Sequence, residues 1–178
     1  MFYITTVKDH IRVPPRMFSD NLEESIIKQI KAKYEGYISK DRGIVIDVSK
    51  IRDIKDGIII PEDGASYYET TFDLITFNAD LHEVFIGKIK DIADFGAFIS
   101  LGPIEGMIHV SQTMDDFVSF SKDKVLLGKE TKRSLKVNDI CRARMIATSY
   151  KDVANPKFGL TMRQPGFGKL EWFREEKK

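Results

Sequence analysis

The chain has 178 residues, of which 42% are hydrophobic and 31% charged, and its formal net charge at pH 7 is +1. This composition is typical of a soluble, cytoplasmic globular protein with one large or two small domains. The sequence contains no run of about 18 apolar residues, which is the length needed to cross a membrane. A single cysteine excludes an internal disulfide framework, and three scattered histidines lack metal-ligand spacing, so neither a metal nor a cofactor is expected.

Residues 1–81 predict a small α+β domain with the element order β-α-β-β. Residues 2–13 are rich in β-forming side chains, and residues 43–54 and 67–78 read as two further strands. Between the first and second strands, residues 19–36 show the periodicity of an amphipathic helix.

The predicted helix carries signals at both ends. Asp20 followed by Glu23 resembles a capping box, and Gly36 stands where a C-terminal cap is expected. One apolar face is formed by Leu22, Ile26, Ile30 and Tyr34. This face is expected to pack on the sheet.

Residues 82–165 predict an all-β, five-stranded barrel of the OB-fold type. The expected strands are 83–91, 95–101, 105–111, 139–150 and 157–163. Residues 112–138 form a long connection that carries Lys129, Lys132, Arg133 and Lys136, and for this basic insert a solvated loop is favoured over an RNA contact. Residues 166–178 are expected to be a short helix or tail.

Strand parity places one group of side chains outside the barrel. In the sequence DFGAFISLGPIEGMIHVSQ, Phe98 and His109 have the outward parity, and Gly96 could bend the strand to bring Phe95 beside them. Outward cations on the predicted strands are Lys88, Arg142, Arg144, Lys157 and Arg163, whereas Cys141, Ala143, Met145, Ala147, Phe158, Leu160 and Met162 have the inward parity. Two aromatic rings, a histidine and cations are typical of a surface that binds single-stranded nucleic acid.

The same stretch has two other interpretations. The two rings could instead close one end of the barrel, with His109 as an ordinary surface histidine. Asp94-Phe95-Gly96 also matches the metal-binding tripeptide of protein kinases, but the chain has neither their glycine-rich loop nor their catalytic-loop motif. Residues 82–165 carry 13 basic and 10 acidic side chains, against 11 and 14 in residues 1–81, which weakly favours a phosphate-bearing partner.

The second half resembles the S-one domain, an RNA-binding OB fold. The residues that carry the resemblance are VFIGKIKDIADFGAFISLGPIEGMIHVS, SLKVNDICRARMIA and KFGLTMRQ. By position in these motifs, the resemblance implies that Phe95, Phe98 and His109 line the RNA face. It adds Lys157 and, in the preceding loop, Asp152.

The whole chain resembles the E-prime family, the larger of the two stalk subunits of archaeal RNA polymerase. IRVPPRMF, IIIPEDGASYYETTFDLITF and LTMRQPGFGKLEW carry this resemblance. It implies a non-catalytic protein that pairs with the small F subunit of the polymerase, docks on the polymerase core subunits and binds nascent single-stranded RNA. The expected docking tip contains Ile58, Ile59, Ile60, Pro61 and Gly64, with an ordinary exposed hairpin as the alternative.

Some features leave alternatives open. Trp172, the single tryptophan, could pack on its own domain or belong to an interface. An RNA-binding protein of translation or of RNA degradation is a further possibility, although the acidic residues are too dispersed to suggest a nuclease centre.

Overall fold

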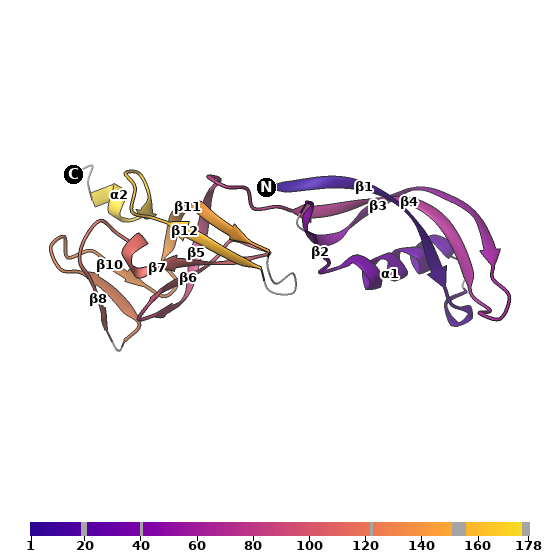
Figure 1. Cartoon of the computed structure of the whole chain (residues 1–178), viewed down its shortest axis with the longest axis horizontal. Helices are drawn as coiled ribbons and strands as arrows, with labels where there is room; N and C mark the ends of the chain where they lie inside the picture. The colour runs from indigo at the N-terminus through magenta and orange to yellow at the C-terminus, as the bar shows by residue number, and fades with distance from the viewer. Residues whose placement is uncertain (19–20, 40, 122, 151–155, 176–178) are drawn as a thin grey trace. The chain divides into compact units, whose positions relative to one another are not determined.

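The computed structural model describes residues 1–18, 21–39, 41–121, 123–150 and 156–175. They form two compact units, Met1–Asn78 and Ala79–Lys178 (Figure 1). The boundary expected from the sequence lies three residues later, after residue 81.

The first unit is an antiparallel sheet with one long helix against it (Figure 1). Its elements are β1 (Phe2–Val13), η1 (Pro15–Met17), α1 (Leu22–Tyr34), β2 (Ile38–Ser39), β3 (Gly43–Ile59) and β4 (Ser66–Phe77). The strand order is β1-β4-β3-β2. The predicted α+β class and the order β-α-β-β are confirmed, and the two-residue strand β2 is an addition that the sequence pattern did not predict.

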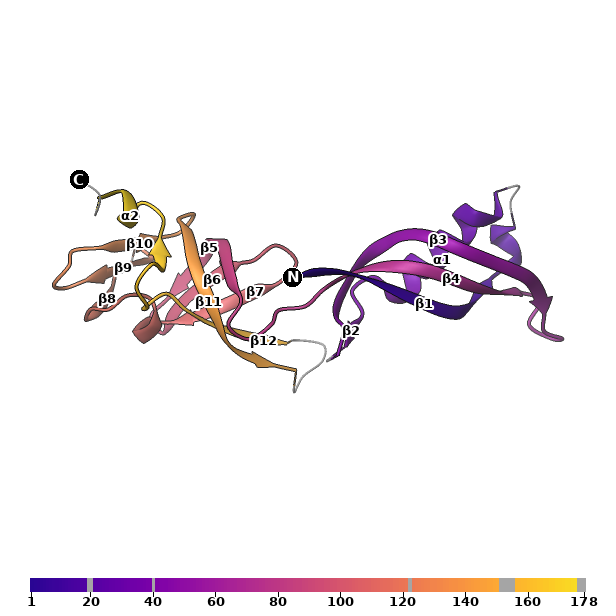
Figure 2. The same ribbon diagram turned by 90° about the horizontal axis from the view of Figure 1, so that it is seen from above.

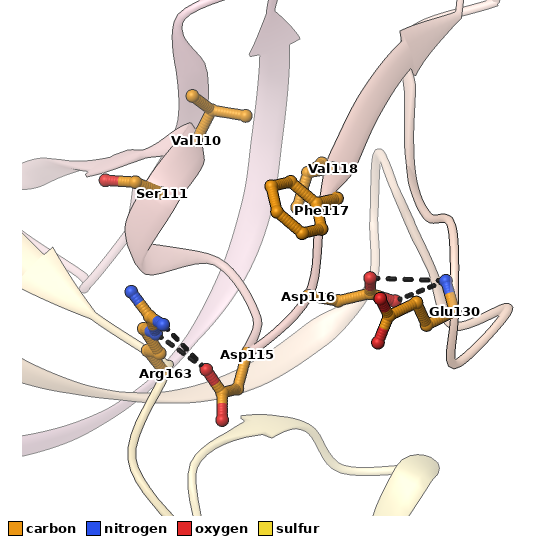
Figure 3. Close-up of a pocket in the computed structure, with 8 residues that line it drawn as sticks. All are labelled: Val110, Ser111, Asp115, Asp116, Phe117, Val118, Glu130 and Arg163. Atoms are coloured by element: carbon orange, nitrogen blue, oxygen red, sulfur yellow. Dashed lines mark hydrogen bonds and ion pairs between the residues drawn. The ribbon is translucent and has the colours of Figure 1, made fainter.

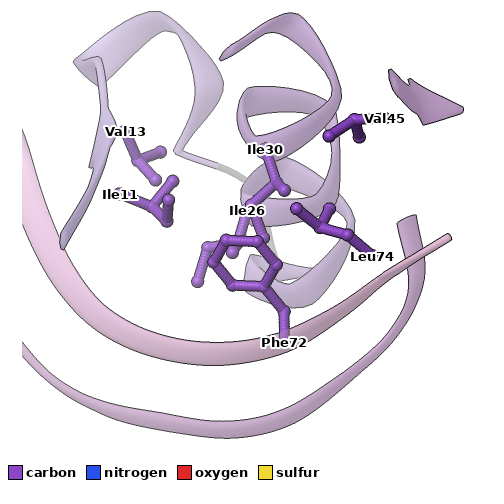
Figure 4. Packing of buried hydrophobic residues seen from close by; sticks show 7 residues of the cluster. All are labelled: Ile11, Val13, Ile26, Ile30, Val45, Phe72 and Leu74. Atoms are coloured by element: carbon purple, nitrogen blue, oxygen red, sulfur yellow. The ribbon is translucent and has the colours of Figure 1, made fainter. Parts of the chain in front are cut away.

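The core of this unit lies between α1 and the sheet. It consists of Ile11, Val13, Ile26, Ile30, Val45, Phe72 and Leu74, drawn in Figure 4. Ile26 and Ile30 are fully buried, and Leu22 and Tyr34 pack at the margin of the cluster. The predicted apolar face of the helix is therefore the face that meets the sheet.

Strand β3 owes its shape to a spacing of three in its apolar residues. In a regular strand, residues three apart point to opposite faces. Register shifts follow Val45, Val48, Ile51 and Ile54 in the pairing of β3 with β4, and each adds a residue to β3. All four side chains can therefore face the helix, and each packs in or against the core.

The N-terminal cap of α1 differs from the prediction. Asn21 is the cap residue, and its side-chain oxygen accepts the backbone N–H of Glu24 at 3.3 Å. Asp20, the predicted cap, lies outside the described residues. Asparagine caps helices as well as aspartate does, so the motif sits one residue further along than the sequence pattern indicated. Gly36 follows the last turn with a φ of 75°, a conformation that favours glycine.

Asn21→Ala is expected to destabilise the first unit by about 1 kcal/mol, because the N–H of Glu24 loses its acceptor. Urea unfolding followed by circular dichroism measures this change. Glu23→Gln, at the other residue of the predicted capping box, serves as the control and should change stability by less than about 0.5 kcal/mol. A larger effect of the control than of Asn21→Ala would contradict this cap assignment.

The second unit is a closed five-stranded barrel with an added small sheet and a C-terminal segment (Figure 2). Its elements are β5 (Val84–Ala93), β6 (Gly96–Ser100), β7 (Glu105–His109), η2 (Val110–Gln112), β8 (Val118–Ser121), β9 (Val125–Gly128), β10 (Ser134–Lys136), β11 (Ile140–Ser149), β12 (Lys157–Thr161), β13 (Gly168–Lys169) and α2 (Trp172–Glu175). The barrel order is β12-β7-β6-β5-β11, and pairing of β11 with β12 closes it. The predicted OB-type barrel is confirmed.

The barrel interior follows the predicted parity with one exception. Cys141, Ala143 and Met145 on β11 are fully buried, as are Ala97 and Ile99 on β6. Phe158, Leu160 and Met162 also point inward. Ala147 was predicted to be inside but is exposed, because a register shift between Met145 and Ala147 reverses the alternation.

The connection 112–138 is not an open loop. It contains the three-stranded antiparallel sheet β10-β9-β8, in which Leu126 and Leu135 are completely buried. Asp116 fixes the following turn by accepting backbone N–H groups from Glu130 and Thr131. Partial desolvation opposes ionisation, but these hydrogen bonds prevail and lower the pKa of Asp116 to about 2. The prediction of a loop was wrong because strands of three or four residues show too little alternation to be recognised.

Candidate nucleic-acid interface

Two phenylalanine rings lie together on the outside of the barrel. The Phe95 and Phe98 ring centroids are 5.9 Å apart, and the ring planes meet at 88°. The Phe95 side chain is 49% exposed and Phe98 is half-buried. The rings therefore share one outer surface, as the sequence predicts, and are not part of the barrel core.

Gly96 allows this arrangement. It pairs with His109 of β7, and a Cβ at Gly96 would lie 2.3 Å from the carbonyl oxygen of Ile108. Only glycine lets β6 begin so close to β7. The turn before Gly96 then places Phe95 beside Phe98 rather than inside the barrel.

His109 completes the face at the end of β7. Its Nδ1 accepts the backbone N–H of Ser111 at 3.3 Å and lies 2.8 Å from the Ser111 hydroxyl oxygen. Because Nδ1 is engaged, Nε2 is the ring nitrogen that remains for a ligand. The structure thus brings Phe95, Phe98 and His109 together.

Two of the predicted cations flank this face. Lys88 is exposed on β5, next to β6, and Lys157 is exposed at the start of β12, next to β7. Two ion pairs that the sequence pattern did not predict lie on the same side. The Lys90 ammonium group contacts the Glu105 carboxylate, and the Lys124 Nζ lies 2.6 Å from an Asp91 oxygen. Asp91 is paired with Phe98 in the sheet, so Lys124 joins the β8–β9 turn to the aromatic face.

Arg142 and Arg144 point outward, but they contact the C-terminal segment and not the aromatic face. The Arg142 guanidinium lies 5.5 Å from the Phe173 ring centroid, and that of Arg144 lies 4.9 Å from the Phe167 centroid. Arg144 also donates a hydrogen bond to the Gln164 side chain at 2.8 Å. Strand parity gave the direction of these side chains correctly, but the segment that covers them could not be read from β11.

The same segment joins the small sheet to the barrel. Trp172 is buried, with the Arg133 guanidinium 5.5 Å from its ring centroid. A Cβ at Gly168 would lie 2.7 Å from this indole, and the φ of Gly168 is 123°. Of the two predictions for Trp172, packing on its own domain is confirmed. Asp152, which was predicted to line the RNA face, lies outside the described residues.

The predicted docking tip is the turn between β3 and β4. Ile58 and Ile59 are 63% and 66% exposed, and Ile60, Pro61 and Gly64 are exposed as well. The turn itself is held by Asp63, whose carboxylate accepts hydrogen bonds from the Arg12 Nε at 2.9 Å and the Tyr67 hydroxyl at 2.6 Å. These bonds lower the pKa of Asp63 to about 2. The tip therefore presents apolar side chains on a fixed turn.

No helix among the described residues is long and apolar enough to cross a membrane. Within the same residues, no group of three or more histidine, cysteine, aspartate or glutamate side chains is placed to hold a metal ion.

Comparison with known proteins gives a full-length match. The chain is 33% identical over 177 residues to "DNA-directed RNA polymerase subunit Rpo7" of Sulfolobus acidocaldarius, which covers 99% of this chain and 97% of that protein. The chain belongs to the Rpo7 family of RNA polymerase subunits. The Rpo7 protein of Saccharolobus solfataricus is also 33% identical, with both chains fully covered. "DNA-directed RNA polymerase III subunit RPC8" of Bos taurus is 28% identical over 68% of this chain and 60% of its own.

Two domain families match this member of the Rpo7 family. Residues 8–64 match the "SHS2 domain found in N terminus of Rpb7p/Rpc25p/MJ0397", and residues 79–151 match the "S1 RNA binding domain". The first match contains the exposed tip, and the second contains the aromatic face. The chain thus consists of an SHS2 domain followed by an S-one domain.

Proposed function

We propose that this Rpo7-family chain is the larger stalk subunit of a DNA-directed RNA polymerase and binds the emerging RNA as a single strand. The observation that carries this proposal is the exposed face of Phe95, Phe98 and His109 on a barrel that matches the S-one RNA-binding family. Bases stack on exposed rings of this kind without sequence preference. The chain is expected to supply no catalytic residue, and nucleotide addition is assigned to other subunits.

The cations near the face have different roles in this proposal. Lys88 and Lys157 are exposed on the strands that flank β6 and β7, so they can follow the RNA phosphates. Arg142 and Arg144, which strand parity placed among the predicted RNA contacts, are assigned to anchoring the C-terminal segment, because aromatic rings cover them.

The tip of the first unit is proposed to dock on the polymerase core. Exposed isoleucines on a turn fixed by Asp63 have the character of an interface anchor, because they lose little conformational freedom on binding. A separate surface is expected to pair with the small helical F subunit. The site of action is then the cytoplasm, where transcription takes place in an archaeal cell.

Affinity purification from the native host tests the assignment. The tagged chain should recover the large polymerase subunits and one small helical partner at moderately high salt. Recovery of ribosomal or RNA-degrading proteins instead would contradict the polymerase assignment and favour an RNA-binding protein of translation or RNA decay.

The salt dependence of RNA binding tests the roles of the two lysines. Each phosphate contact contributes about 0.7 to the slope of log affinity against log salt concentration for single strands. The double variant Lys88→Ala/Lys157→Ala should therefore reduce this slope by about 1.4. Fluorescence anisotropy with labelled oligouridylate measures it. Lys28→Ala/Lys50→Ala, which removes the same charge from the first unit, should leave the slope unchanged, and an equal change in both variants would contradict the assignment.

A further inference from the structure

A hollow of about 450 Å³ lies between the η2 segment and the start of β8. Val110 and Ser111 form one wall, Phe117 and Val118 form another, and Arg163 lies at the base (Figure 3). The Phe117 side chain is directed toward the segment that carries Val110 and Ser111 (Figure 3). This volume is within the usual range of about 300–1,000 Å³ for small-molecule sites and is sufficient for one nucleotide.

Phe117 is presented to solvent by a fixed backbone. Its side chain is 74% exposed, the largest fraction of any exposed large hydrophobic residue in the described part of the chain. Its carbonyl oxygen accepts the backbone N–H of Lys129 at 2.9 Å, and the preceding Asp116 caps the turn at Glu130 and Thr131. A ring on a held backbone can stack on a ligand with little loss of conformational entropy.

The hollow adjoins the aromatic face through two of its lining residues. The Val110 N–H donates to the Phe95 carbonyl oxygen at 2.9 Å, and the Ser111 hydroxyl oxygen lies 2.8 Å from His109 Nδ1. The two residues that line one wall of the hollow thus also hold the aromatic face in place. A single-stranded RNA that extends from His109 past Ser111 would therefore reach the hollow.

The chemistry of the walls favours a base over a phosphate. The Asp116 and Glu130 carboxylates border the hollow, and the Arg163 Nε donates to Asp115 at 2.9 Å, so its charge is already paired (Figure 3). Carboxylates repel a phosphate but accept hydrogen bonds from base N–H groups, such as the ring N3–H of uracil. A ring that stacks, with acceptors at the rim, suits a nucleobase whose phosphates remain outside.

We propose that this hollow binds one further nucleotide of the same RNA strand, with its base stacked on Phe117. The inference rests on the proposed RNA-binding function and extends the path of the strand from the barrel onto the small sheet β8–β10. The family motif residues alone do not include this position.

The test compares two oligouridylates, of about four and about ten nucleotides, on the full-length chain. Phe117→Ala should weaken binding of the longer RNA about five-fold or more, the effect of losing one stacked base, and should change binding of the shorter RNA less than about two-fold. Phe117→Trp should restore the affinity. Ultraviolet crosslinking of the longer RNA to the wild-type chain should mark the peptide that contains Phe117.

Phe18→Ala is the matched control. Phe18 is also an exposed ring, but it belongs to the first unit, so its removal should not affect either RNA. Unchanged binding of the longer RNA by Phe117→Ala, with binding still lost on removal of Phe95 and Phe98, would overturn this inference and leave the proposed function intact. Loss of co-purifying polymerase subunits with unchanged RNA affinity would identify a protein contact and also overturn it. Absence of RNA binding by the wild-type chain would instead refute the proposed function itself.

Discussion

The double variant Phe95→Ala/Phe98→Ala is expected to bind single-stranded RNA about 30-fold more weakly than the wild-type chain, or weaker still. Each exposed ring can stack one base, and alanine substitution at such a position costs about 1–3 kcal/mol. The two rings lie 5.9 Å apart on one outer surface, so one strand can contact both. Fluorescence anisotropy with labelled oligouridylate at fixed salt measures the loss.

The same variant should remain folded. Phe95 is 49% exposed, and loss of the Phe95–Phe98 contact is expected to lower the free energy of unfolding by only about 1 kcal/mol. Phe18→Ala/Tyr37→Ala removes two exposed rings from the first unit and should bind RNA normally. A large loss of thermal stability in the Phe95/Phe98 variant would mean that the rings serve the core, which is the alternative interpretation of this stretch.

Ile58→Glu/Ile59→Glu is expected to weaken association with the polymerase core about 30-fold or more, the effect of losing an interface anchor worth about 2 kcal/mol. Both side chains are largely exposed, so the charges cost little in the free chain, but burying them against a partner leaves them unpaired. Affinity purification followed by quantification of the large subunits measures the loss.

The design separates docking from the other proposed contacts. The glutamate variant should still bind RNA and should still co-purify the small helical partner, because neither contact is assigned to the tip. Ile4→Glu, at an exposed isoleucine on β1, is the matched control for added charge. Retention of the large subunits by the tip variant would show that docking uses another surface.

The fold could be predicted wherever a local period matched a regular element. The face of α1 that contains Ile26 and Ile30 was predicted correctly on this basis, as was the inward parity of β6 and of β11 up to Met145. Bulges were not predictable, because an added residue changes the period without changing the composition. Ala147 was therefore predicted to be inside the barrel, and the repeated shifts in β3 were not foreseen.

The candidate site was only partly accessible to sequence reasoning. Phe95, Phe98 and His109 lie on neighbouring strands joined by a short connection, so parity and the family motif together could place them on one face. Lys124 and Phe117 belong to a segment whose fold depends on burying Leu126 and Leu135. Their closeness to the aromatic face became visible only with the structure.

Alternation and turn residues were enough to predict the two-part organisation, the barrel class and the outward direction of Phe98, because these signals act over a few neighbours in the chain. Which outward side chains stay free depends on the packing of distant segments. Arg142 and Arg144 are covered by Phe173 and Phe167, more than twenty residues further along the chain. Contacts of such long range arise when complete elements pack together, and no local pattern on β11 records them.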